Sequence, residues 1–65
     1  MDIRVNNDII AIVVRRENIS KVGGGAPIFI AETEEELEEI GMLLARITRG
    51  MVHDLKNGIH ILVRH

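Results

Sequence analysis

The chain has 65 residues, a formal net charge of −2 and no cysteine. The lack of cysteine excludes a disulfide framework and a thiolate zinc site, and the slightly acidic balance argues against a general attraction to nucleic acid or to an anionic membrane. A chain of this length buries only about 60% of the surface that it exposes when unfolded, so we expect a single domain over residues 1–65 that gains stability by oligomerisation.

Three strands are predicted in the first half of the chain. Residues 2–6 alternate between polar and apolar side chains, as a half-buried strand does, and the polar residues 6–8 predict a hairpin turn after it. Residues 9–14 form the second predicted strand and are apolar on both of its faces. The third strand is predicted over residues 26–31, where Pro27 near the start indicates that an amide is not needed. Both faces of the second strand therefore require burial.

Three consecutive glycines, Gly23-Gly24-Gly25, precede the third predicted strand. A phosphate-binding loop would place its glycines between a strand and the amino end of a helix. These glycines lead into a strand instead, and the only predicted helix begins with glutamates that would repel an anion. We therefore expect a flexible turn or a bulge here, with a mobile loop that becomes ordered on binding a partner as the alternative.

A helix is predicted after the third strand. Thr33 followed by Glu36 fits a capping box, in which the threonine oxygen accepts an amide hydrogen bond and the glutamate reaches back to the backbone. The glutamates at residues 34–36 also favour the positive end of the helix dipole. Apolar residues then recur at spacings of three and four and predict one continuous stripe: Leu37, Ile40, Leu44, Ile47, Met51 and Leu55.

The end of this helix depends on Gly50. The stripe keeps its phase through Gly50, and the residues after it do not alternate as a strand should, so the pattern favours a helix that continues to Lys56 or Asn57. In the alternative interpretation the helix ends after Arg49, and Asn57-Gly58 is the turn of a final hairpin.

The predicted element order is β-β-β-α-β, with the last strand at residues 59–65. We therefore predict a small α+β domain with an antiparallel or mixed sheet and one amphipathic helix on one face. Because one helix covers only one face of a sheet, the other face is predicted to be buried against a second copy of the chain or against a different partner protein. The candidates for this shared surface are Ile10, Ile12, Val14, Phe29 and Met42.

The polar residues predict neither a catalytic site nor a metal site. His53, His60 and His65 lack the spacings of a metal clamp on a helix or a strand, so we interpret them as surface histidines. The glutamates at the helix start are interpreted as stabilising the helix. Ser20 is the only serine, and no nucleophile motif surrounds it. We therefore predict no cofactor, no metal and no enzymatic activity.

The favoured function is a non-enzymatic interaction or structural module that acts as a homodimer or higher oligomer in the cytoplasm. The longest strongly apolar run, residues 9–14, is far too short to span a bilayer, so no membrane insertion is expected. The alternative is an oligomeric nucleic-acid-binding regulator in which copies of Arg15, Arg16 and Lys21 form a composite basic patch. Phe29 is the only aromatic residue, so the stacking of single-stranded bases has little support.

Overall fold

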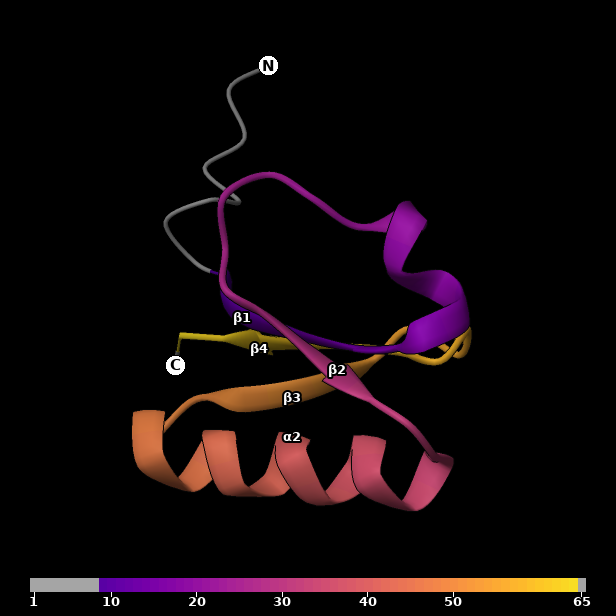
Figure 1. Ribbon diagram of the computed structural model, residues 1–65. Helices are drawn as coiled ribbons and strands as arrows, with labels where there is room; N and C mark the ends of the chain where they lie inside the picture. The colour runs from indigo at the N-terminus through magenta and orange to yellow at the C-terminus, as the bar shows by residue number, and fades with distance from the viewer. Residues whose placement is uncertain (1–8, 65) are drawn as a thin grey trace.

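The computed structural model describes residues 9–64, which form a mixed four-stranded sheet with chain on both of its faces (Figure 1). The strands are β1 (Ile9–Arg15), β2 (Ile28–Ala31), β3 (Met51–Asp54) and β4 (Ile59–Val63). They lie in the order β2-β1-β4-β3, with β2 parallel to β1 and β4 antiparallel to both of its neighbours. Helix α2 (Glu34–Thr48) runs along one face, and the short 3-10 helix η1 (Arg16–Lys21) lies on the other side.

The predicted fold class is confirmed, because one sheet of mixed direction carries one main helix on one face. The predicted order also matches approximately: β1, β2, α2 and β4 correspond to the second strand, the third strand, the helix and the last strand. The strand predicted at residues 2–6 lies outside the described residues. The structure differs from the favoured prediction after the helix, where strand β3 replaces the predicted continuation of the helix.

Strand β1 is apolar on both faces because each face belongs to a separate core. The core under the helix contains Ala11, Val13, Ala31, Leu37 and Leu62, with Ile40, Leu44, Ala45 and Val52 packed against it. The opposite core contains Ile12, Val14 and Ile59, with Ile9, Val22, Ala26, Ile30 and Ile61 packed against it. The sheet therefore buries apolar side chains on both sides within one chain.

The second core corrects one prediction. Ile12 and Val14 were expected on a surface shared with another molecule, but they are 6% and 0% exposed in this chain alone. Val22 and Ala26, from the segment between η1 and β2, supply part of the cover. The face opposite the helix is thus covered in part by the chain itself, as the arch of residues above the sheet in Figure 1 shows.

The start of α2 confirms the predicted cap. Thr33 is the N-cap residue, and its Oγ1 accepts a hydrogen bond of 3.0 Å from the amide of Glu36. The carboxylate of Glu36 accepts a hydrogen bond of 2.6 Å from the amide of Glu32, one residue before the N-cap. This arrangement satisfies one free backbone donor in the first turn of the helix, the amide of Glu36, and the amide of Glu32 just before the N-cap.

The end of α2 shows that the favoured long helix is wrong and that the alternative hairpin is right. The helix ends at Thr48, and Arg49 takes a left-handed conformation with φ of 60°. The chain then enters β3, which pairs with β4, and a loop containing Asn57-Gly58 joins the two strands. A Cβ on Gly50 would lie 2.8 Å from the carbonyl oxygen of Val63, so the glycine allows the chain to turn closely past β4.

The main helix has 15 residues and an acidic first turn. Across residues 9–64, none of the helices has the length and apolar character that crossing a bilayer would need.

Candidate protein-interaction surface

The five residues predicted for a shared surface are divided between the core and the outside of the chain. Ile12 and Val14 are buried, and Ile10 is half-buried beside the bulge in β1. Phe29 and Met42 are 39% and 61% exposed. Of the predicted set, only these last two residues therefore present a large apolar side chain to the outside.

Two further apolar side chains of α2 face outward, and neither was among the residues predicted for a shared surface. Leu43 is 50% exposed and Ile47 is 76% exposed. The sequence pattern placed Ile47 in the inward stripe, but the line of helix residues that meets the sheet runs through Leu37 and Gly41, which are both buried. Successive helix residues are about 100° apart, so Ile47 lies about 120° around the helix from Gly41 and faces outward.

The surroundings of Gly41 show which strands the two sides of α2 face. A Cβ on Gly41 would lie 3.5 Å from Nδ1 of His60 in β4 and 3.6 Å from Cγ1 of Val52 in β3. The Gly41 side of α2 therefore faces β3 and β4, and the flank that carries Leu43 and Ile47 lies toward β2. We refer to this flank of the helix as the helix flank.

Strand β2 contributes an apolar side chain next to the helix flank. Phe29 pairs in register with Val13, and Val13 belongs to the core under the helix. Because paired residues of neighbouring strands point to the same face of a sheet, Phe29 also lies on the helix side. We call the exposed residues Phe29, Leu43 and Ile47 the flank surface.

One sequence signal could have revealed the flank surface. Met42, Leu43 and Leu44 are three consecutive apolar residues within one helix. Consecutive helix positions are about 100° apart, so three of them cannot all face a single sheet. Only Leu44 packs against the core, while Met42 and Leu43 are exposed on different sides of the helix.

The arginines of the predicted basic patch are already paired with carboxylates. Arg15 Nη1 lies 3.1 Å from Glu34 Oε2, and its Nη2 lies 3.5 Å from Glu17 Oε2. Arg16 donates through its guanidinium fork to both carboxylate oxygens of Glu32, with Nε 3.0 Å from Oε2.

These contacts change the charge of the region. The hydrogen bonds from Arg16 hold the pKa of the Glu32 carboxyl below its usual value, and the same contacts raise the pKa of Arg16. Lys21 is exposed at the end of η1. Two of the three cations proposed for nucleic-acid contact thus neutralise carboxylates of the same chain, which weakens the composite basic patch.

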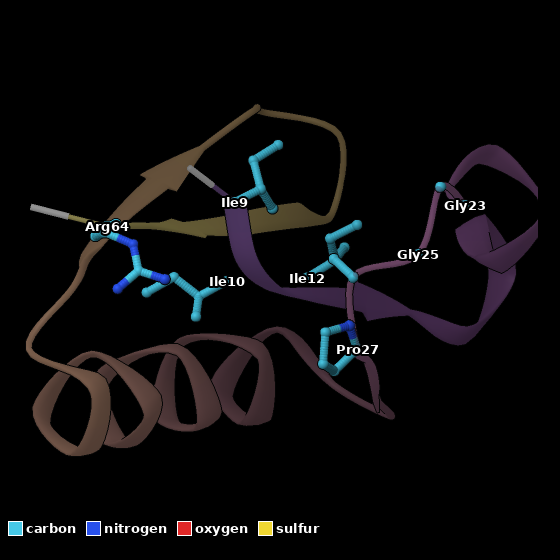
Figure 2. Close-up of a pocket in the computed structure, with 9 residues that line it drawn as sticks. Ile9, Ile10, Ile12, Gly23, Gly25, Pro27 and Arg64 are labelled. Carbon is cyan, nitrogen blue, oxygen red and sulfur yellow. The ribbon is translucent and has the colours of Figure 1, made fainter. Parts of the chain in front are cut away.

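The glycine segment forms a turn between η1 and β2. Gly24 and Gly25 have φ values of 99° and 97°, which glycine adopts readily and other residues rarely do. The segment lines an open pocket of about 470 Å³ together with Pro27, Arg64 and three isoleucines of β1: Ile9, Ile10 and Ile12. Figure 2 shows Arg64 and Ile10 at one end of this pocket and Gly23 at the other. The segment leads into a strand and meets no helix start, as the turn interpretation requires.

The histidines were predicted to lie at the surface, and this prediction is wrong for His60. His53 is exposed, but His60 is only 7% exposed, beneath Gly41 of the helix. Its Nε2 lies 3.5 Å from Asp54 Oδ1, and its buried Nδ1 has no hydrogen-bond partner. His65 lies outside the described residues. Among residues 9–64, no group of three histidine, aspartate or glutamate side chains could hold a metal ion together.

Comparisons with known proteins give one family and one similar protein. A family model described as "Capping complex subunit for YIEGIA" matches residues 6–65. The "Uncharacterized protein YpzH" of Bacillus subtilis (strain 168) is 28% identical over 57 residues, which cover 88% of this chain and 86% of that protein. No solved structure matches significantly.

Proposed function

We propose a function for this chain, which belongs to the family of capping complex subunits for YIEGIA. The chain is a non-enzymatic subunit that acts as a homo-oligomer. It docks on a partner protein through the flank surface. The observation that carries the proposal is the exposure of Leu43 and Ile47. Both faces of the sheet have cores within the chain, and yet these two large side chains, with Phe29, point outward. Apolar residues grouped on one side of a small protein are typical of an interaction surface.

The residues around Met42 suggest the character of the partner. Met42 and the exposed carboxylates of Glu35, Glu38 and Glu39 line a shallow groove on the outer side of α2. A partner that covers the helix would meet an apolar flank beside an acidic rim. Lysine or arginine side chains around an apolar centre would complement it, and such rim charges mainly increase the rate of association.

The non-enzymatic part of the proposal depends on the residue types present. The chain contains no cysteine, and Ser20 is its only serine, with no nucleophile motif around it. The proposed compartment is the cytoplasm, because a chain without cysteine carries no sign of an oxidising one.

Co-purification tests the docking. The tagged full chain is expressed with the YIEGIA protein of the same organism, and the amount of partner recovered is measured. The double variant Leu43→Ser and Ile47→Ser removes two anchors that would each contribute about 1–2 kcal/mol, so we expect recovery to fall by tenfold or more.

A matched control uses a residue on the other side of the sheet. Lys21→Ser changes an exposed side chain of η1 and should leave recovery unchanged. Both variants should remain folded at the temperature of the experiment, because Lys21 and Ile47 are exposed and Leu43 is half exposed. Unchanged recovery with the double variant would show that the flank surface does not dock, and no recovery with the parent chain would overturn the docking proposal itself.

A further inference from the structure

Strand β2 is an outer strand of the sheet within residues 9–64, and its four residues carry no charge, no proline and no bulge that would hinder pairing at the outer edge. It neighbours only β1 in the order β2-β1-β4-β3. Natural edge strands are commonly protected by charged residues, proline or a bulge. The four residues of β2, Ile28-Phe29-Ile30-Ala31, include no charged residue and no proline, and their register with β1 is regular.

The direction of the backbone groups of β2 follows from one hydrogen bond. The amide of Ile12 donates to the carbonyl of Pro27 at 2.9 Å, so the Pro27 carbonyl points toward β1. The backbone groups of successive strand residues point to alternate sides. The N–H and C=O of Phe29 therefore also face β1, whereas those of Ile28 and Ile30 face the open edge.

We propose that β2 pairs antiparallel with β2 of a second copy, about a two-fold axis that passes next to Phe29. This inference rests on the homo-oligomer part of the proposed function. In this register Phe29 lies opposite the partner's Phe29 as a pair without hydrogen bonds, which agrees with the inward direction of its backbone groups. Ile28 lies opposite Ile30 of the partner subunit, and the outward N–H and C=O groups of each such pair bond to one another.

The residue sequence of β2 supports a second copy as the occupant. A two-fold interface must be complementary to itself, and Ile28 and Ile30 are identical residues on either side of Phe29. The pairing therefore brings together apolar residues and an aromatic pair, and it opposes no like charges. A register centred on Ile30 would place Glu32 opposite an isoleucine, so the centre at Phe29 fits better.

The proposed pairing also joins the two flank surfaces. Opposed residues of an antiparallel pair share a face of the sheet, so both α2 helices lie on the same side of the extended sheet. The helix flank faces β2, and hence it faces the two-fold axis. Leu43 and Ile47 of both copies would border one apolar surface with the two Phe29 rings between them.

Cysteine cross-linking tests the register, because the chain has no cysteine of its own. Residues opposed without hydrogen bonds have Cα atoms about 4.5 Å apart, which lies within the range that a disulfide bridges. We expect Phe29→Cys to give a covalent dimer under mild oxidation that a reductant reverses. Met42→Cys, at a more exposed site away from the axis, is the matched control and should cross-link far less.

Two measurements on the unsubstituted chain keep the test sound if the Phe29→Cys change weakens the dimer. Light scattering over a dilution series should give twice the chain mass at high concentration. Hydrogen exchange at the Ile28 and Ile30 amides should slow by tenfold or more in the same range.

The outcomes separate the two proposals. A dimer in which Phe29→Cys does not cross-link and the Ile28 and Ile30 amides exchange freely would overturn the pairing of β2 but retain the homo-oligomer. A monomer at every concentration would overturn both the pairing and self-association. The docking of a partner protein is judged separately by co-purification.

Discussion

At Gly50 the chain passes so close to its neighbours that a side chain has no room. A Cβ there would lie 2.8 Å from the Val63 carbonyl oxygen and 3.0 Å from Ile10 Cδ1. The backbone oxygen is held in the sheet and cannot move aside as a flexible side chain can. We expect Gly50→Ala to lower the free energy of unfolding by about 1–3 kcal/mol, as overpacked cores do, measured by urea denaturation.

Gly23→Ala is the control for Gly50→Ala. No atom lies within 4 Å of a Cβ built on Gly23, and its φ is outside the left-handed region. An alanine there should cause no loss of stability, because it only restricts the unfolded chain. Equal losses at the two positions would contradict the packing argument.

Gly41 should respond in the opposite direction from Gly50. It lies inside α2, and a Cβ there would meet Nδ1 of His60 at 3.5 Å and Val52 at 3.6 Å, which are ordinary contact distances. Glycine inside a helix is about 1 kcal/mol less favourable than alanine. We therefore expect Gly41→Ala to raise the free energy of unfolding by about 0.5–1 kcal/mol in the same urea experiment. A loss of stability would show that the packing around His60 cannot accept the methyl group.

At the scale of elements, the ion pair between Arg16 and Glu32 joins η1 to the connection between β2 and α2. Because Arg16 lowers the pKa of Glu32, the pair stabilises the folded chain at pH values above the pKa of an unfolded glutamate. This contribution is lost as the pH falls through the lowered pKa of the folded state. Both side chains are exposed, so the effect on stability is small.

The titration of Glu32 is the sensitive measurement of this pair. We expect the carboxyl carbon of Glu32, followed by NMR, to titrate below the usual range of a glutamate. Arg16→Gln should raise that midpoint, whereas Lys21→Gln, at the other end of η1, should not. A midpoint that does not respond to Arg16→Gln would mean that the fork is not formed in solution.

The two ends of α2 show which element boundaries the sequence could predict. The start depends on Thr33 and Glu36, which are close in sequence, and the predicted cap is confirmed. The end depends on the approach of Gly50 to Val63, thirteen positions further along the chain, and on the pairing of β3 with β4. The apolar spacing of Met51 and Leu55 continued the helical period by coincidence, so a local pattern favoured the wrong end.

At the scale of the whole molecule, the sequence predicted correctly that both faces of the sheet need burial, but it could not identify the cover. Val22 and Ala26 are isolated apolar residues with no periodic pattern, and only the fold brings them over Ile12 and Val14. The candidate surfaces are therefore the flank surface and the edge of β2. Phe29 is the residue of the predicted set that belongs to both.

The sheet order has a consequence for how the chain can fold during synthesis. The central strand β1 pairs on one side with β4, so Val13 lies opposite His60 although most of the described chain separates them. Until residues 59–63 have emerged from the ribosome, one edge of β1 has no strand to pair with, and the core under α2 lacks Leu62. Such distant pairing slows folding, because a long loop must close before the contact forms. We therefore expect the sheet to assemble only after nearly all of the described residues have been made, and nascent chains to need protection of their apolar strands until then.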